Sequence, residues 1–527
     1  MSNGITSNGA GTNGRLSETS TPTAIGSTVD NSRTLILCFD GTSNRYNEKN
    51  TNVVKFMSLI KNDVPERQLV YYQPGIGTYT NPGIFTPLSM KMANILDEAV
   101  AWYIGAHITG GYKWLMNTYR QGDRICIFGF SRGAYTARAL AGMLNKVGLL
   151  PAGNDEQVTV AYDIYRTDTK EGYTLSDGFR DTFSRVVPIE FVGVWDSVSS
   201  VGLIRSHTLP YAASNYIIAN FRHAMALDEH RSWFTVDPWH IPDIDLEGRV
   251  NPFLARTFGY VHEPNSQGMF ARFLAWLAFG RQKPVAEVER AGRQPGVTGD
   301  KLFAVGTGSK ARHAATDVKE VWFAGCHSDV GGSSVADTTP HSLSNITLRW
   351  MVRECQLTHT RIIWNEPRLR QLAIDLSPER LELSRTITNQ AREVHERGAI
   401  PAYDTEFGPL LSKFEEGRAE IEDAKSPVYD SLMPKWTWPA FFPLGFNLMW
   451  WILEFFPMKL WFQDDRGKWH SRHRINMGRP RHAVTVTSEV PAFHVSVLAK
   501  QQHHVEGKKP YEPRANLDKG VVPLYVD

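Results

Sequence analysis

Short apolar runs recur along the chain, and each ends in a polar or glycine-bearing turn. The four clearest runs cover 34–39, 125–128, 189–195 and 321–326. They are rich in β-branched and aromatic residues and show no polar alternation, which is typical of central parallel strands covered on both faces. A fifth candidate strand, 68–72, stands ahead of a proline- and glycine-rich turn.

Helical patterns lie between these runs, notably over 90–119 and 132–147. The alternation of strand and helix predicts an α/β fold with a mostly parallel central sheet flanked by helices. Ligands of such sheets bind beyond the carboxyl ends of the strands. The polar residues of most interest therefore directly follow the predicted strands: Asp40, Ser131, Asp196 and His327.

Two stretches interrupt the alternation. A helical piece is expected over 216–234, and a passage rich in Gly, Lys and Arg follows over 280–313; both are assigned to an insertion with a mobile loop. From 361 to about 469 the sequence becomes helical and then aromatic. We expect this region and the insertion to form cap-like additions above the sheet. The predicted organisation is a disordered tail (1–32), a catalytic domain (33–360, with an insertion over about 201–319), a helical aromatic-rich cap (361–480) and a segment returning to the catalytic domain (481–527).

Composition narrows the classes of partner. The 527 residues carry 57 basic and 55 acidic side chains, so the overall charge gives no case for nucleic-acid binding. The four cysteines lack metal-ligand spacing and are interpreted as buried free thiols of a reducing compartment, with no metal or cofactor expected. The first 32 residues have neither a basic start nor an apolar segment, so we expect no secretory signal and a cytoplasmic location.

The segment 123–144 reads as a strand, a sharp turn and an amphipathic helix, with Ser131 at the turn. Its centre is Gly129-Phe-Ser131-Arg-Gly133. A serine oxygen reacts only where a base can reach it, and the two glycines allow the tight turn that presents it. The segment is predicted to be the nucleophile elbow of an α/β-hydrolase.

A serine nucleophile needs a base and an acid that orients the base. In α/β-hydrolases these residues follow in the order Ser, Asp or Glu, His. Asp196 follows one predicted strand and His327 follows another, so the expected triad is Ser131, Asp196 and His327. His494 is the alternative base, and Asp329 is the alternative acid.

The loop 39–44 follows the first predicted strand. Backbone N–H groups of Gly41 and Thr42, together with that of Arg132 after the nucleophile, are expected to form an oxyanion hole. Asp40 and Asn44 are expected to shape this loop. Asp40 and Asp329 could together bind a hard cation, but two carboxylates without a spaced ligand series do not predict a metal site.

Four motifs occur in order: Phe39-Asp-Gly-Thr42-x-Asn44, Gly129-Phe-Ser-Arg-Gly-Ala134, Trp195-Asp-Ser-Val198 and Cys326-His-Ser-Asp-Val-Gly-Gly332. This combination resembles a family of α/β-hydrolases whose best understood members are type VI secretion phospholipase effectors of bacteria. The resemblance runs from about 33 to 344 and resumes at 429–432 and 493–497. It implies hydrolysis of carboxylic esters, above all of lipids, through an acyl-enzyme on Ser131, with Asp196 as the acid and His327 as the base.

The segment 436–453 contains no charged residue for 18 positions, which approaches membrane-spanning length. Two prolines within it argue against one regular helix, and five tryptophans lie between positions 436 and 461. Three interpretations stay open: a buried cap helix, a peripheral membrane contact through 436–462, or a span. A cation cluster that could meet anionic head groups follows: Lys468, Arg472, Arg474, Arg479 and Arg481.

Two other functions compete with ester hydrolysis. The loop at Asp40 is similar to the Asp-x-Asp-Gly-Thr loop of haloacid-dehalogenase-like phosphatases, but Cys38 occupies the position of their nucleophilic aspartate. A catalytically degenerate hydrolase fold that acts through protein partners is the second alternative. The intact Ser131, Asp196 and His327 favour an enzyme acting on a lipid or another ester.

Overall fold

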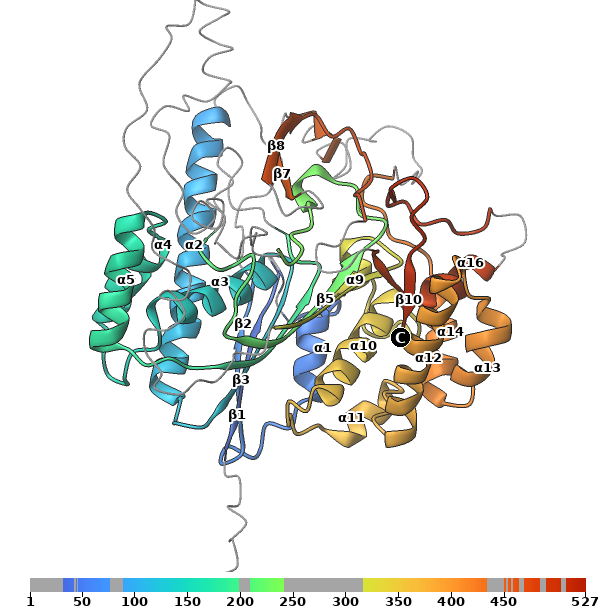
Figure 1. Ribbon diagram of the computed structural model, residues 1–527, viewed down its shortest axis with the longest axis horizontal. Helices are drawn as coiled ribbons and strands as arrows, with labels where there is room; N and C mark the ends of the chain where they lie inside the picture. Colours follow the sequence, from blue (N-terminus) through green and yellow to red (C-terminus); the bar gives the residue numbers. More distant parts are fainter. Residues whose placement is uncertain are drawn as a thin grey trace, which may run out of the picture.

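A computed structural model describes residues 32–41, 44, 46–75, 89–198, 209–240, 316–433, 450–451, 454–455, 458–463, 469–483, 490–503 and 509–527. Its centre is an eight-stranded sheet in which every pair of neighbouring strands is parallel (Figure 1). The order is β10-β9-β6-β5-β4-β3-β1-β2. The strands are β1 (Thr34–Phe39), β2 (Gln68–Gln73), β3 (Arg124–Phe130), β4 (Ile189–Trp195), β5 (Ile218–Ala226), β6 (Asp317–Phe323), β9 (Ala492–His494) and β10 (Leu524–Val526).

Both faces of the central strands are buried, as the absence of polar alternation predicted. In β1, Leu35 and Leu37 pack into one hydrophobic cluster, whereas Ile36 and Cys38 pack into the other. All four side chains are fully buried. Successive side chains of a strand point to opposite faces, so a run of apolar residues gives each face its own core.

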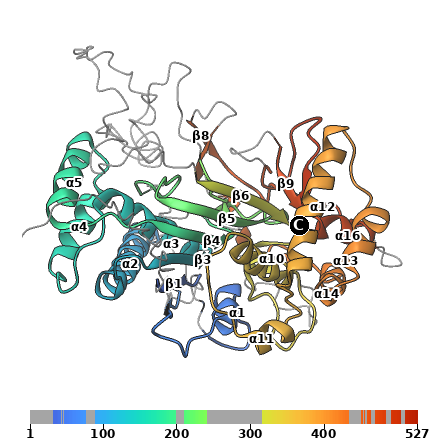
Figure 2. The same cartoon turned by 60° about the horizontal axis from the view of Figure 1, so that its bottom comes forward.

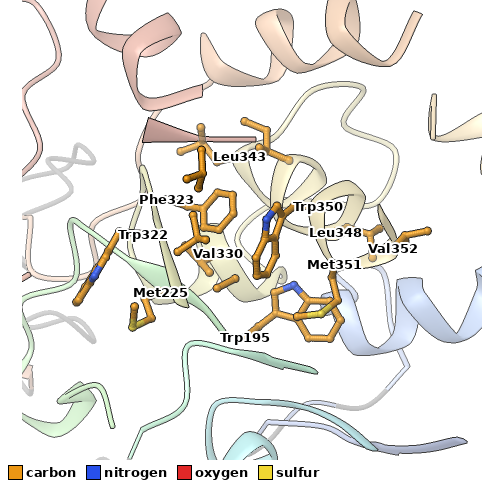
Figure 3. Packing of buried hydrophobic residues seen from close by; sticks show 14 of the residues in the cluster. Trp195, Met225, Trp322, Phe323, Val330, Leu343, Leu348, Trp350, Met351 and Val352 are labelled. Atoms are coloured by element: carbon orange, nitrogen blue, oxygen red, sulfur yellow. The ribbon is translucent and has the colours of Figure 1, made fainter. Parts of the chain in front are cut away.

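Helices cover both faces (Figure 2). One face carries α2 (Ser89–Thr118), α3 (Arg132–Val147), α4 (Gln157–Arg166) and α5 (Lys170–Phe183). The other face carries α1 (Asn52–Leu59), α9 (His327–Gly331), α10 (Leu343–Leu357) and α16 (Ser496–Gln502). On this second face, Trp350 and Met351 of α10 lie beside Trp195 of β4 in the core (Figure 3). The predicted α/β fold is therefore confirmed.

One predicted element is wrong. The helix expected over 216–234 is instead strand β5, in the middle of the sheet, followed by a single 3₁₀ turn η1 (Ser232–Phe234). Ile218, Phe221 and Met225 recur at spacings that also suit a helix, so periodicity alone could not separate the two. Pairing with β4 and β6 decides for the strand.

The expected cap divides into two parts. Most of its helices lie beside the β10 edge of the sheet and contribute Ile387, Tyr403 and Leu411 to the same hydrophobic cluster as α10 (Figures 1 and 2). The first of them, over 366–371, lies beside α1 instead. Further along the chain, β7 (Met458–Gln463) and β8 (Trp469–Arg474) form a separate antiparallel pair. The helical part comprises α11 (Glu366–Gln371), α12 (Pro378–Glu396), a π-helical turn η2 (Tyr403–Phe407), α13 (Gly408–Leu411) and α14 (Glu415–Ala424).

Several predictions fall outside the described residues. They concern the tail 1–31, Thr42, the passage 280–313 and nearly all of 436–453. Among the described helices, none combines the length and the apolar character needed to cross a bilayer. The four cysteines are buried and free, as predicted.

Candidate active site

Ser131 stands between the end of β3 and the first residue of α3, with φ 59° and ψ −124°. A positive φ in a residue other than glycine costs on the order of 1–3 kcal/mol and persists only where the surrounding structure enforces it. The Ser131 N–H donates to the carbonyl of Trp195 at 3.0 Å, which fixes the turn against β4. The serine is therefore held in the strained backbone conformation of a nucleophile elbow.

The two glycines of the elbow are required by close backbone approach. A Cβ on Gly133 would lie 2.3 Å from the carbonyl oxygen of Phe39 and 2.4 Å from that of Asp40. A Cβ on Gly129 would lie 2.5 Å from the carbonyl oxygen of Gly133. These contacts are with backbone atoms, so a side chain at Gly133 would push α3 away from β1, and one at Gly129 would push α3 away from β3.

Asp196 and His327 meet at the carboxyl edge of the sheet. Asp196 directly follows β4, the neighbour of β3, and His327 is the first residue of α9 after β6. The Nδ1 atom of His327 lies 2.5 Å from Oδ2 of Asp196, and both side chains are buried. This bond leaves the Nε2 atom of His327 as the nitrogen available to a serine hydroxyl.

Arg481 completes the surroundings of Asp196. Its two terminal nitrogens lie 2.6 and 2.9 Å from the two carboxylate oxygens, and the Ala226 N–H donates to Oδ1 at 2.9 Å. Burial raises the pKa of Asp196, but the charge of Arg481 and the hydrogen bond to His327 outweigh burial and hold that pKa well below its usual range. Asp196 is thus a permanent anion that can orient and stabilise an imidazolium.

Aromatic rings enclose His327 on two sides. The ring of Phe130 lies 4.6 Å from the imidazole, and the ring of Phe234 lies 4.6 Å from it at a steep angle. Burial lowers the pKa of His327, partly offset by the bond to Asp196. The lowered pKa favours the neutral imidazole, the form that a general base needs.

Glu229 joins the site from the loop after β5. It accepts the backbone N–H of His327 at 3.2 Å and pairs with Arg231 at 2.7 Å. Burial raises its pKa, but Arg231 outweighs burial and brings the pKa to about 2. Glu229 thus holds the first turn of α9, which carries the histidine.

The loop at Asp40 differs in part from expectation. Oδ1 of Asp40 accepts the Gly41 N–H at 2.7 Å and the Thr51 hydroxyl at 2.9 Å, and Oδ2 accepts the Tyr72 hydroxyl at 2.9 Å. Gly41 is therefore not a free oxyanion donor, and this part of the prediction disagrees with the structure. Gly41 instead permits close packing, because its Cβ would lie 3.2 Å from that of Ser131.

The other predicted members of this loop have different outcomes. Asn44 closes the turn, since its N–H donates to the Gly41 carbonyl at 3.0 Å and its carbonyl accepts from Gly75 at 2.9 Å. Thr42 lies outside the described residues. Arg132 follows Ser131 as the first residue of α3, where helix N–H groups lack partners within the helix. An oxyanion hole from Arg132 and Thr42 stays a prediction.

The alternative base and acid lie in other contacts. His494 is on β9, with its Nδ1 3.5 Å from Glu420 and its Nε2 3.5 Å from Asp527. Asp329 accepts the N–H groups of Cys326 at 3.0 Å and Tyr429 at 2.9 Å, and burial raises its pKa to about 6. Neither residue takes the place of Asp196 or His327 in the pair described above.

One group of metal-ligand type occurs among the described residues. Glu420, His494 and Asp527 bring their ligand atoms within 4.8 Å of one another. Arg353 and Arg380 already pair with Asp527 at 2.8 and 2.7 Å, so its carboxylate is neutralised by the protein itself. Asp40 and Asp329 do not belong to this group.

The sequence did not predict Arg481 and Glu229 as residues of the site, and Arg481 was given a different role. Arg481 was expected to belong to a cation cluster facing lipid head groups, but it is buried and bound to Asp196. A position 285 residues after its partner leaves no local spacing signal. Glu229 was missed because β5, the strand before it, was taken for a helix.

The parallel sheet, the strained serine elbow and the buried Asp–His pair at the carboxyl edge define an α/β-hydrolase-like protein. The chain belongs to the family of T6SS phospholipase effectors described as the Tle1-like catalytic domain, whose family model matches residues 33–354. It is also 29% identical over 535 residues to the Saccharomyces cerevisiae protein described as uncharacterized protein YEL023C. That match covers 86% of this chain and 77% of the yeast protein.

Two solved structures show more distant similarity. An uncharacterized protein from Pseudomonas aeruginosa is 16% identical, with a TM-score of 0.30, over 76% of this chain and 58% of that chain. The Tle1 effector bound to the VgrG spike of the type 6 secretion system is 18% identical, with a TM-score of 0.21, over 39% of this chain and 47% of that chain. The chain thus spans about half the length of these two solved chains.

Proposed function

We propose that the protein is a serine hydrolase that cleaves carboxylic esters of phospholipids through an acyl-enzyme on Ser131. The observation that carries the proposal is the 2.5 Å bond between His327 and Asp196 beside a serine held at positive φ. The family, which is one of phospholipase effectors, supports a lipid substrate. The triad and the ester specificity are part of this proposal.

In this reaction the neutral Nε2 of His327 removes the proton of Ser131, whose oxygen attacks the ester carbonyl. The resulting imidazolium faces the Asp196 carboxylate, which Arg481 keeps ionised. The tetrahedral oxyanion is stabilised by the Arg132 N–H and, in our proposal, by that of Thr42. His327 then returns its proton to the leaving alcohol, and water hydrolyses the acyl-enzyme by the same route.

The described part of the aromatic segment lies next to this site. Trp450 contacts Phe234, the residue that packs on His327, at 5.4 Å between ring centroids. Glu454 is buried and accepts the Ser232 N–H at 2.6 Å. We propose that 436–462 makes a peripheral contact with the lipid surface.

A fluorophosphonate probe tests the proposed reaction. Folded wild-type protein is expected to be labelled stoichiometrically, because the probe reacts only with an activated serine. Ser131→Ala should abolish labelling, and His327→Ala should reduce it by about 10³-fold or more. Normal turnover by His327→Ala would transfer the base role to His494, and no labelling of folded wild-type protein would favour the degenerate-hydrolase alternative.

The substrate class is tested with lipids. A phospholipid extract incubated with the wild-type protein should lose intact phospholipid and gain free fatty acid, whereas Ser131→Ala should leave it unchanged. Deletion of 436–449, which keeps Trp450 and Glu454, should weaken activity on vesicles while sparing a soluble short-chain ester. Equal loss on both substrates would contradict the lipid-surface role of this segment.

A further inference from the structure

The Arg132 side chain begins one residue after the nucleophile and is half-buried. Its Nε atom is buried and has no hydrogen-bond partner. Within the described part of the chain, no carboxylate lies within ion-pair distance of its guanidinium. Withdrawing part of a guanidinium from water without a compensating charge is costly, because the group stays charged in a protein.

Other arginines that are wholly or partly buried provide the comparison. Each of the eight arginines that are almost fully buried in the described residues pairs with at least one carboxylate. They are Arg33, Arg138, Arg222, Arg231, Arg349, Arg353, Arg380 and Arg481. Arg185 is half-buried like Arg132 and also has an unpartnered Nε, but it lies over the ring of Tyr119 and donates to the Tyr119 carbonyl at 3.2 Å. The described residues give the guanidinium of Arg132 neither a carboxylate nor such a contact.

The local field reinforces the charge of Arg132. It occupies the first position of α3, a helix of 16 residues with no acidic side chain in its first turn, and Ser131 makes no side-chain cap. Unsatisfied N–H groups and the helix dipole make such an N-terminus attractive to anions. Burial lowers the pKa of Arg132 only to about 10, so the side chain stays charged at neutral pH.

We propose that Arg132 binds the phosphodiester group of a glycerophospholipid and so places its ester carbonyl at Ser131. This inference rests on the proposed function. Arg is suited to the role because its planar guanidinium donates two parallel hydrogen bonds to phosphate oxygens. In a glycerophospholipid only the glycerol unit separates the phosphate from the scissile esters, a span that one arginine side chain can bridge. The phosphate of the lipid would supply the negatively charged partner that no described carboxylate provides to the guanidinium of Arg132.

Binding measurements in the Ser131→Ala protein test the proposal without turnover. Two monomeric ligands are titrated: dihexanoyl phosphatidylcholine, and dihexanoylglycerol, which lacks the phosphate. Arg132→Gln should weaken phospholipid binding by about 10- to 100-fold, as expected for lost charge-assisted hydrogen bonds, and diacylglycerol binding by about twofold at most. Arg132→Lys should recover part of the phospholipid affinity, since it keeps the charge but not the bidentate geometry.

Two further arms separate charge from site and lipid from free phosphate. Arg392→Gln on the exposed face of α12 removes the same charge and should leave both affinities unchanged. Inorganic phosphate should compete with the phospholipid when Arg132 is present and not in Arg132→Gln. Binding of inorganic phosphate without any preference for phospholipid over diacylglycerol would overturn the lipid assignment.

The remaining outcomes are also decisive. A parallel loss of both lipids in Arg132→Gln, or no loss of either, would sink the proposal. Absence of fluorophosphonate labelling in wild-type protein would refute the proposed reaction. The Arg132-dependent preference for the phosphate-bearing ligand is independent of labelling and is decided by the binding titrations alone.

Discussion

At the scale of single residues, the site depends on an ion pair that reaches across the chain. Asp196 is completely buried and receives both terminal nitrogens of Arg481. Removing one partner of a buried pair leaves the other charge uncompensated, which typically costs about 3–5 kcal/mol. Arg481→Met should therefore lower the free energy of unfolding by about that amount and reduce kcat/KM.

The neighbouring Arg479 provides the control, because it is exposed. Arg479→Met should change the free energy of unfolding by less than about 0.5 kcal/mol. Urea denaturation of both variants, together with turnover of a soluble ester, checks the pair of expectations. Equal free energies of unfolding and equal turnover in the two variants would contradict a stabilising role of Arg481 at the Asp196 carboxylate.

The histidine gives a prediction about pH. Because burial lowers the pKa of His327 below its ordinary 6.5, the imidazole stays in its neutral, base-competent form as the pH falls through 6.5. The acid limb of kcat/KM on a soluble ester should then lie below pH 6.5. The same profile measured with an ester that has no ionisable group removes the contribution of the substrate. A limb above pH 6.5 would contradict a buried neutral base.

At the scale of elements, the elbow predicts a sharp difference between two glycines. Gly133→Ala places a Cβ against the carbonyls of Phe39 and Asp40, so we expect a loss of stability of about 1–3 kcal/mol or more and loss of probe labelling. Gly178 lies within α5, with nothing within 4 Å of an added Cβ. Gly178→Ala should stabilise by up to about 1 kcal/mol. Thermal unfolding of both variants tests the contrast.

The elements also show what sequence patterns can and cannot reveal. Buried strands such as β1 and β4 were predicted at their observed bounds, because an apolar run ending in a polar turn is a local signal. Strand β5 was missed since Arg222 and His223 break its apolar run. Their partners Glu354 and Glu320, which make them acceptable inside the sheet, lie far along the chain. The positions of Ser131, Asp196 and His327 after strands were predicted from the same local signal, whereas Arg481 had none.

At the scale of the whole molecule, a buried ionic network joins the helices beside the β10 edge to the sheet. Asp527 pairs with Arg353 of α10 and Arg380 of α12. Burial raises its pKa, but the two arginines outweigh burial and hold the pKa well below 3.8. The stability from this carboxylate is therefore fully present above the usual aspartate pKa and is lost as the pH falls through the depressed one.

Asp527→Asn removes that charge while keeping the shape of the side chain. We expect it to lower the free energy of unfolding at neutral pH by about 3–5 kcal/mol, because two buried guanidinium groups lose a partner. Arg385 and Glu382 form an exposed pair on α12, and Arg385→Gln should cost less than about 1 kcal/mol. Denaturation at neutral and acidic pH should show the difference shrinking in acid. An unchanged midpoint for Asp527→Asn would mean that the network contributes little.

The bond between Asp196 and Arg481 also has a consequence for biosynthesis. Chains grow from the amino end, so Ser131, Asp196 and His327 all leave the ribosome well before Arg481 does. Until then the aspartate has no cation to keep it charged in a dry interior, and β9 and β10 have yet to join the sheet. A nascent or truncated chain would carry every member of the proposed triad and still lack a working site. Under the proposed function, the enzyme would therefore gain activity only after the segment that carries Arg481 has been made and has packed against the sheet.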